Sequence, residues 1–189
     1  MFMKNVSNSN FGKVVLPVFF VCLFSSLIQE AKADTPSRTA ISNVFSGALI
    51  TVWATGANNW LWGYTPYDAR NWVDLYNWDV IYNSDSTLTF KNRSTKYCMV
   101  AFDGRGLTHN TCSDGNNQRF SLLPTASGAV QIKSISQGKC IKIGSKSNQW
   151  AFRVEFTDCT KSDSVVDTSQ LWILGPERNA SRSASHDEL

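Results

Sequence analysis

The chain has 189 residues and a formal net charge of +3, and 42% of its residues are hydrophobic. This length and composition suit one folded domain with a hydrophobic core and exclude an intrinsically disordered chain. Lys and Arg are scattered among Asp and Glu instead of forming a basic stretch, which argues against a partner that is a nucleic acid.

Residues 1–33 have the pattern of a secretory signal peptide. Lys4 and Lys13 precede the apolar run Val14–Ile28, and a small-x-small cleavage sequence ends at Ala33. The apolar run is shorter than the roughly 20 residues that a transmembrane helix needs. The bulky Val21 before Cys22 argues against a lipid anchor on that cysteine. We therefore expect cleavage after Ala33 and a secreted protein.

Residues 45–82 hold most of the seven tryptophans of the chain. Trp53 and Trp78 lie in apolar strand patterns, and we expect both in the core. The stretch "NNWLWGYTPYDAR" from Asn58 is rich in turn residues and is expected to be irregular chain at the surface. Exposed Trp and Tyr suit contact with a partner protein or, less often, with lipid headgroups. The residues expected at this contact are Trp60, Trp62, Tyr64, Tyr67 and Arg70.

The same stretch also matches a pattern proposed for cholesterol contact. Its three positions are Leu61, Tyr64 and Arg70, with Tyr67 as an alternative tyrosine. This pattern fits many unrelated proteins and is weak evidence for a sterol partner.

Two later stretches, from Leu88 and from Val130, can be laid over each other. Each contains an alternating apolar strand, a Cys, a turn with Gly, a second Cys and a closing Gln-x-aromatic motif. The closing motifs carry Gln118 with Phe120, and Gln170 with Trp172. A more diverged upstream copy ends at Trp78. Short-strand units of about 40 residues cannot bury their faces alone and must pack against their copies.

Three such units resemble the β-trefoil of ricin-type lectins, whose repeats carry a Gln-x-Trp signature. The resemblance implies an all-β fold with a single trefoil domain over residues 34–175, followed by a polar tail over 176–189. Four cysteines follow the signal sequence, and an even number in a secreted protein favours two disulfides, for which three pairings exist. The trefoil repeats imply one bridge within each of two units, Cys98–Cys112 and Cys140–Cys159.

Ricin-type sugar sites have an Asp two residues after the first Cys of the repeat, where it clamps two sugar hydroxyls. The corresponding residues here are Val100 and Lys142. Neither can accept two hydroxyl hydrogen bonds as a carboxylate does. Asp103 comes later and is expected in a turn with Gly104. We therefore expect recognition of protein or membrane instead of sugar at these positions.

The sequence gives no indication of an enzyme, a metal site or a cofactor. It has no HExxH or GxSxG motif and no phosphate-binding glycine loop. Cysteines held in disulfides serve neither as nucleophiles nor as metal ligands. His109 is expected on a surface loop. These observations favour a non-catalytic binding module.

The stretches "SNVFSGALITVW" and "WDVIYNSDSTLTFKN" are similar to the C subunit of bacterial cytolethal distending toxins, over residues 38–175. The resemblance implies a protein without enzymatic activity that assembles with the A subunit, a second trefoil, and with the B subunit, a nuclease. The assembly would deliver the nuclease to host cells through a surface glycan, a protein or a cholesterol-rich membrane. The A subunit of this family is longer and lipid-modified, so the residue before Cys22 favours the C subunit.

The last four residues, His186, Asp187, Glu188 and Leu189, match the signal that retrieves proteins to the endoplasmic reticulum. In a toxin, this tail would be read inside the host cell. The alternative is a eukaryotic lectin-like protein of the endoplasmic reticulum lumen, with Asn92 and Asn179 as glycosylation acceptors. The family resemblance favours the toxin.

Overall fold

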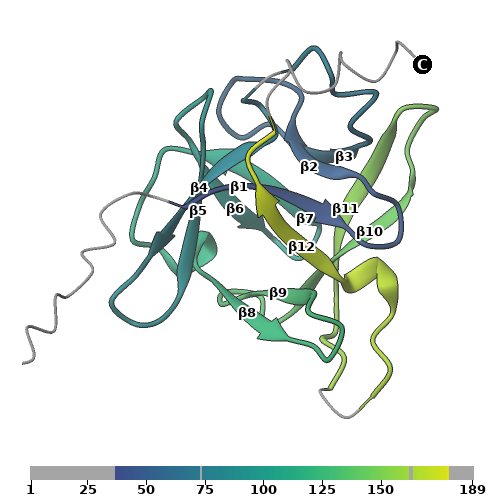
Figure 1. The fold of residues 1–189 in the computed structure, drawn as a ribbon. Coiled ribbons are helices and arrows are strands. Elements are labelled where there is room, and N and C mark those ends of the chain that lie inside the picture. Colours follow the sequence, from purple (N-terminus) through teal and green to yellow (C-terminus); the bar gives the residue numbers. More distant parts are fainter. Residues whose placement is uncertain (1–36, 73, 162–163, 179–189) are drawn as a thin grey trace, which may run out of the picture. The chain divides into compact units, whose positions relative to one another are not determined.

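The structure, a computed structural model, describes residues 37–72, 74–161 and 164–178, and these form an all-β fold (Figure 1). The described residues contain two 3-10 helices, η1 (Asn116–Gln118) and η2 (Thr168–Gln170), and twelve strands. The strands are β1 (Ser37–Asn43), β2 (Leu49–Val52), β3 (Leu61–Tyr64), β4 (Asn77–Tyr82), β5 (Leu88–Asn92), β6 (Cys98–Phe102), β7 (Gly106–Asn110), β8 (Phe120–Pro124), β9 (Val130–Ser134), β10 (Cys140–Lys146), β11 (Ala151–Thr157) and β12 (Trp172–Pro176).

Six strands close into a barrel. β1 pairs with β4, β4 with β5, β5 with β8, β8 with β9 and β9 with β12, all antiparallel. β12 then returns to β1, where Thr39 lies opposite Pro176. Closure leaves no barrel strand at the edge of an open sheet.

The other six strands form three hairpins, β2–β3, β6–β7 and β10–β11. Each hairpin lies between the first and last strands of one four-strand unit. The units are β1–β4, β5–β8 and β9–β12, which we call the first, second and third unit. This arrangement is a β-trefoil, and it confirms the repeats expected from the sequence.

The same turn follows the first strand of every unit. The carbonyl oxygen of the strand's last residue accepts a hydrogen bond from the backbone N–H four residues later, over 2.9–3.0 Å. These donors, Gly47, Lys96 and Gly138, all have positive φ, between 62° and 66°. Asn43 and Asn92 each cap their turn, because their side-chain oxygens accept from two further backbone N–H groups.

The closing aromatics of the three units meet in the core. Trp78, Phe120 and Trp172 are fully buried. The indole N–H of Trp78 donates to the carbonyl oxygen of Ile50, and that of Trp172 to the carbonyl oxygen of Ile141, each over 3.0 Å. Phe120 fills the equivalent position without a donor. The Gln-x-aromatic motif therefore marks the residues around which the units pack.

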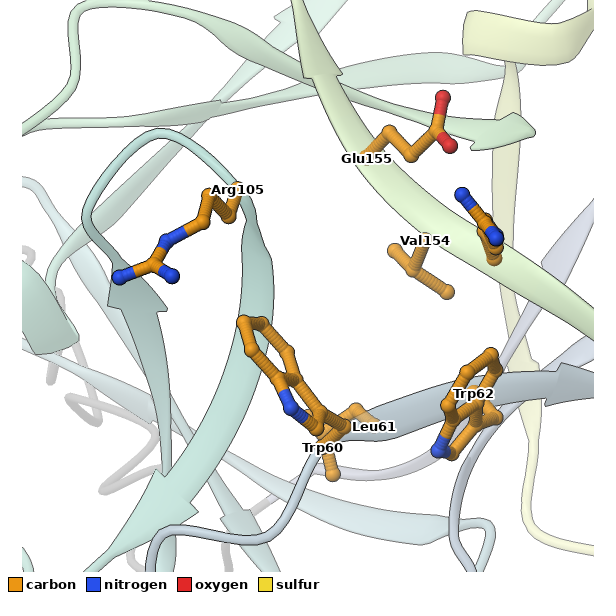
Figure 2. Close-up of a pocket in the computed structure, with 7 residues that line it drawn as sticks. Trp60, Leu61, Trp62, Arg105, Val154 and Glu155 are labelled. Atoms are coloured by element: carbon orange, nitrogen blue, oxygen red, sulfur yellow. The ribbon is translucent and has the colours of Figure 1, made fainter.

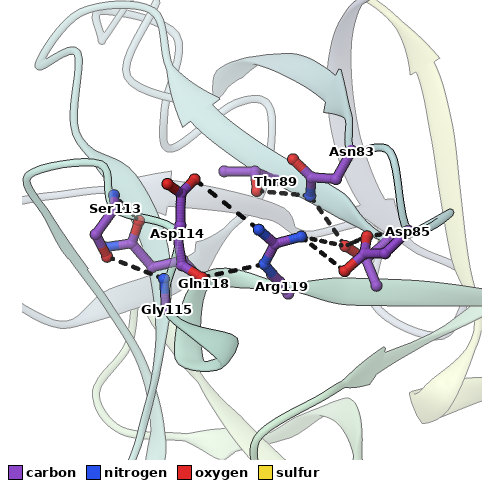
Figure 3. A network of polar contacts seen from close by, with 9 residues as sticks. Asn83, Asp85, Thr89, Ser113, Asp114, Gly115, Gln118 and Arg119 are labelled. Atoms are coloured by element: carbon purple, nitrogen blue, oxygen red, sulfur yellow. Dashed lines mark hydrogen bonds and ion pairs between the residues drawn. The ribbon is translucent and has the colours of Figure 1, made fainter.

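In the second unit, the glutamine of the motif binds the chain on both sides of the second cysteine, Cys112. Gln118 is buried, donates to the carbonyl oxygen of Thr111 and accepts from the N–H of Ser113, both over 2.8 Å. The next residue, Arg119, lies between the carboxylates of Asp85, at 2.7 Å, and Asp114, at 3.9 Å (Figure 3).

Asp85 lies in the turn between β4 and β5, so Arg119 joins this turn to the end of η1. The hydroxyl and the backbone N–H of Thr87 both donate to the carboxylate of Asp85, over 2.5 and 3.0 Å. These bonds, with the Thr87 hydroxyl as the largest cause, lower the pKa of Asp85.

The disulfides are Cys98–Cys112 and Cys140–Cys159, as the repeats predict. Each lies within one unit and joins residues 14 and 19 positions apart. The first cysteine of each pair opens a hairpin. In the first unit the corresponding residue is Leu49, which is fully buried.

Two sequence-based expectations about burial are wrong. Trp53 lies one residue beyond the end of β2, and 59% of its surface is exposed. His109 is fully buried in β7 instead of lying on a surface loop. Its polar neighbours in sequence resemble a loop, but Nε2 lies 3.0 Å from the carbonyl oxygen of Ala54, so the imidazole keeps a polar partner inside the fold.

Candidate functional site

β3 joins the hairpins of the first and third units into one sheet. Trp62 lies opposite Thr51 of β2 on one side and opposite Arg153 of β11 on the other. The resulting order is β2–β3–β11–β10. Just before β3, Trp60 also forms an isolated bridge with Thr108 of β7, in the second unit. The neighbourhood of β3 is therefore where all three hairpins meet.

Side chains alternate along β3 because successive residues of a strand point to opposite faces. Leu61 and Gly63 face the core, and a Cβ at Gly63 would lie 2.5 Å from Cδ1 of Ile143. Trp60, Trp62 and Tyr64 point to the other face. The expectation that these residues form irregular chain is wrong for Leu61–Tyr64, and Tyr64 is buried.

At the Tyr64 end of β3 the surface carries what we call the aromatic patch, Trp53, Tyr67, Arg70, Trp72 and Trp150. The rings of Trp53, Tyr67 and Trp150 are exposed, at 59%, 70% and 52%. The patch surrounds a cavity of about 370 Å³ lined by Trp53, Tyr64, Asp68, Arg70, Trp72, Asn148 and Trp150.

The turn that carries the patch is held by its own hydrogen bonds. The hydroxyl of Thr65 donates to the carboxylate of Asp68 over 2.6 Å and accepts from its N–H over 3.2 Å. The guanidinium of Arg70 lies 4.1 Å from the ring centroid of Tyr67 and donates to the Tyr67 carbonyl oxygen over 2.7 Å. Tyr67 is thus presented on an ordered turn, and less conformational entropy is lost when it is covered.

Tyr64 forms the floor of the patch. Its ring meets Trp72 edge to face with 4.8 Å between centroids. Burial, together with the nearby carboxylate of Asp68, raises the pKa of Tyr64, so its phenol stays protonated at neutral pH.

At the other end of β3 lies what we call the junction cleft, lined by Trp60, Leu61, Trp62, Arg105, Arg153, Val154 and Glu155 around about 230 Å³. Figure 2 shows the two indoles rising from the β3 segment, with Val154 behind the space between them and Glu155 on its far side. Arg105 lies beyond Trp60, in the turn between β6 and β7.

Close backbone packing fixes one wall of the cleft. A Cβ on Gly106 would lie 2.6 Å from the carbonyl oxygen of Val154 and 3.4 Å from the ring of Trp60. Trp60 meets Phe102 edge to face at 5.6 Å. Only glycine therefore allows β7 to approach both β11 and this indole.

The five residues expected to contact a partner divide between these two hollows. Trp60 and Trp62 line the junction cleft, whereas Tyr64 and Arg70 line the cavity of the aromatic patch, with Tyr67 beside Arg70. Trp150 was not expected in the patch. It follows a polar stretch in the third unit, and only the pairing of β3 with β11 brings it near Tyr64.

The cholesterol-contact pattern is not presented as a linear surface motif. Leu61 and Tyr64 are both buried, and only Arg70 of the three is exposed. The alternative tyrosine, Tyr67, is exposed, but the pattern that uses it also needs Leu61, which is buried.

The positions equivalent to the ricin-type sugar clamp carry Thr51, Val100 and Lys142, so none of the three units has a carboxylate there. Asp103 and Gly104 form the expected turn, with φ of 45° and 67°. The carboxylate of Asp103 pairs with Arg105 at 3.1 Å on the surface.

Asn92 is unsuited to carry a glycan. Its side chain is fully buried, and its amide nitrogen donates to the carbonyl oxygen of Leu75 over 3.0 Å. The glycosylation expected at this position under the lumenal alternative is therefore wrong. Asn179, the expected signal peptide over residues 1–33 and His186–Leu189 lie outside the described residues.

The described part of the chain has neither a cluster of metal-ligand side chains nor a helix suited to span a membrane. Among those residues, no three His, Cys, Asp or Glu side chains gather as metal ligands would. Nor does any helix within the same ranges have the length and apolar character needed to cross a bilayer.

Known proteins resemble the chain in sequence. The family described as "Cytolethal distending toxin A/C domain" matches residues 38–183. The cytolethal distending toxin A subunit of Aggregatibacter actinomycetemcomitans is 38% identical over 156 residues, 82% of this chain and 69% of that protein. The A subunit of a Campylobacter jejuni strain is 34% identical over 183 residues, 90% of this chain and 64% of that protein. The C subunit of Escherichia coli is 37% identical over 92 residues, 47% of this chain and 50% of that protein.

Solved structures also resemble the chain in fold. A chain in the crystal structure of the Haemophilus ducreyi cytolethal distending toxin is 36% identical with a TM-score of 0.66, covering 75% of this chain and 84% of that one. The corresponding toxin from Actinobacillus actinomycetemcomitans gives 36% and 0.67, with 75% and 92% covered. The designed three-fold symmetric protein ThreeFoil, at 16% identity, TM-score 0.63 and coverage of 74% and 98%, shares the fold alone. The chain therefore belongs to the cytolethal distending toxin A/C family.

Proposed function

We propose that this chain is a non-catalytic, secreted binding component of a cytolethal distending toxin. It would assemble with a second trefoil protein and a nuclease and bring the nuclease to host cells. Membership of the A/C family supports this role. The observation that carries it is the aromatic patch, an exposed cluster of Trp, Tyr and Arg beside β3.

Both the A and the C subunits occur among the relatives. Alignment with an A subunit reaches 90% of the chain, whereas that with the Escherichia coli C subunit covers 47%. The residue before Cys22 favours the C subunit. We therefore propose the binding role that the A and C subunits share and do not assign the chain to one of them. The mass of the exported protein separates them, because a lipid-modified cysteine adds acyl chains. Neighbouring reading frames for a nuclease and a second trefoil would support the assembly itself.

The lumenal alternative finds no support. The relatives named here come from bacteria, and Asn92 is buried.

We infer that the aromatic patch contacts a partner protein. Trp, Tyr and Arg are the residues most enriched among those that dominate interface energetics. Here they surround a concave surface on an ordered turn. The partner is another toxin component or a protein on the host cell.

The test compares a double variant, Trp53→Ala with Trp150→Ala, with the parent chain. Both side chains are more than half exposed, so the domain should fold normally. Binding to the purified partner proteins of the toxin or to host cells should weaken about tenfold or more. Tyr82→Ala is the matched control, because it removes an exposed ring, 74% accessible, from a barrel strand.

Unchanged assembly and unchanged cell binding in the double variant would overturn the assignment of the patch. Loss of binding to protein-free, cholesterol-containing vesicles, with assembly intact, would reassign it to the membrane.

A further inference from the structure

A surface bend of the first unit covers a fully buried histidine of the second. The bend consists of residues 53–59, between β2 and β3, and its residues are exposed apart from the half-buried Ala54 and Asn59. His109, in β7, is fully buried, and its Nε2 lies 3.0 Å from the carbonyl oxygen of Ala54. The bend contacts the imidazole on one side and solvent on the other, so it shields the imidazole from water.

Three hydrogen bonds join the bend to two neighbouring residues of β7. Besides the imidazole contact, the backbone N–H of Asn58 donates to the carbonyl oxygen of His109 over 2.7 Å. The side-chain amide of Asn110 donates to the side-chain oxygen of Asn58 over 2.6 Å. A segment that buries few of its own side chains opens at a lower free energy than the whole domain unfolds. The bend can therefore open locally, and this would hydrate His109.

The groups that face the imidazole in the described chain are neutral. The ring of Tyr97 meets it edge to face, with 5.5 Å between centroids. Met99 lies opposite it on β6, and the hydroxyl of Thr95 lies 3.5 Å from Nδ1. Residues 53–59 contain no titratable side chain.

Charged residues of the surrounding segments do not compensate a charge on His109. The turn before β6 carries two cations, Arg93 and Lys96. The carboxylate of Asp114, in the loop after β7, is fully exposed. Glu155, on the strand that packs against the start of β7, lies in register with Lys142 of β10. Because a buried imidazolium gains no opposing charge here, burial lowers the pKa of His109.

We propose that the bend over residues 53–59 is an acid-sensitive lid, which leaves β7 when His109 is protonated. In the open state the imidazolium is hydrated, whereas in the closed state it is buried without a counter-charge. The closed state has its full stability above about pH 6.5, the ordinary pKa of histidine. Below this pH, linkage to one proton raises the ratio of open to closed chains by at most about tenfold per pH unit.

The lid begins with a residue of the aromatic patch. Trp53 is its first residue, is 59% exposed and lines the cavity of the patch. Opening would move this indole away from Trp72 and Trp150, on the other side of that cavity. The consequence for binding rests on the proposed function of the patch: a partner held there at neutral pH would be released in mild acid.

Hydrogen exchange of the exported full chain, without any partner, tests the lid at about pH 7.5 and 5.5. The readout is the protection factor, in which the observed rate is corrected for the intrinsic pH dependence of exchange. Protection of the Asn58 amide should decrease about tenfold from the higher to the lower pH. The control is the Gly138 amide, which donates to the carbonyl oxygen of Ser134 over 3.0 Å in the third unit and should change less. Unchanged protection at Asn58, or an equal decrease at both amides, would overturn the lid.

Two variants separate the imidazole from the other contacts of the bend. His109→Gln replaces the imidazole by an amide that does not titrate, so protection at Asn58 should be equal at both pH values. Asn110→Ala removes a hydrogen bond from a half-buried side chain, so its fold should be intact even if His109→Gln destabilises β7. Its Asn58 amide should be less protected at both pH values and keep the tenfold difference. Loss of that difference in Asn110→Ala would also overturn the lid.

A binding measurement tests the link between the lid and the patch. It uses the toxin component or host cell that the double variant, Trp53→Ala with Trp150→Ala, fails to bind. The parent should bind up to about tenfold more weakly at pH 5.5 than at pH 7.5, whereas His109→Gln should keep its affinity. Equal weakening in both proteins would overturn the link. Full binding by the double variant would overturn the proposed function of the patch, and the exchange result would still decide the lid.

Discussion

Nε2 of His109 lies 3.0 Å from the carbonyl oxygen of Ala54, 55 positions earlier in the chain. This contact ties β7 of the second unit to the bend after β2 of the first. A carbonyl oxygen only accepts, so Nε2 carries the proton. Nδ1 lies 3.5 Å from the hydroxyl of Thr95, which donates to Oδ1 of Asn92 over 3.3 Å. Burial lowers the pKa of His109, so the imidazole is neutral at neutral pH.

This arrangement predicts a loss of stability in mild acid. Burial lowers the pKa of His109, so the unfolded chain binds a proton that the folded chain excludes. The free energy of unfolding should be highest above about pH 6.5 and decrease toward the folded pKa, by at most about 1.4 kcal/mol per pH unit. Urea unfolding at about pH 7.5 and 5.5 measures this, and His109→Gln should show a smaller difference. An equal pH dependence in parent and variant would contradict the prediction.

Each disulfide should stabilise the domain independently. Replacing Cys98 and Cys112 by Ser should lower the free energy of unfolding by about 3 kcal/mol, because the reduced chain gains loop entropy when unfolded. The Cys140 and Cys159 pair closes a loop of similar length and should have a similar effect. Denaturant unfolding gives both values. Peptide mapping of the unreduced protein should recover these two links, and a link between units would argue against the structure.

The core indoles also give a matched comparison. Trp78→Phe should lower the free energy of unfolding by about 1–3 kcal/mol, because the carbonyl oxygen of Ile50 loses its buried donor. Phe120 fills the equivalent position of the second unit, so a Phe ring is compatible with this packing. Trp172→Phe is the parallel case at Ile141. A change below about 0.5 kcal/mol would show that the indole hydrogen bond contributes little.

The repeats, the disulfides and the buried closing aromatics could be predicted from the sequence. These features recur at matching positions: in the second and third units a Cys opens the hairpin and a Gln-x-aromatic motif leads into the last strand, and in all three units a buried aromatic lies at the start of the last strand. The exposure of Trp53, the burial of His109 and the place of Trp150 could not be predicted in this way. They depend on contacts between units, and an alignment of one unit with another carries no signal for those contacts.

The last four residues allow a separate test of host routing. We predict that deleting His186–Leu189 leaves secretion, folding and surface binding intact, because the buried hydrophobic residues of the described chain all lie between Ala40 and Trp172. Arrival in the host endoplasmic reticulum, and intoxication after it, should decrease, since retrieval signals are read at a free C-terminus. One glycine added after Leu189 should have the same effect. If both variants intoxicate as the parent does, the match to the signal is a coincidence.

The pairing of β1 with β12 has a consequence for incomplete chains. The first strand acquires its last partner only when residues 172–176 are present, so any product that ends earlier leaves β1 and β9 with a free edge. Free edges are templates for pairing with other chains. Nonsense truncation or proteolysis before Trp172 should therefore yield self-associating material instead of a smaller working protein, however complete its first two units are.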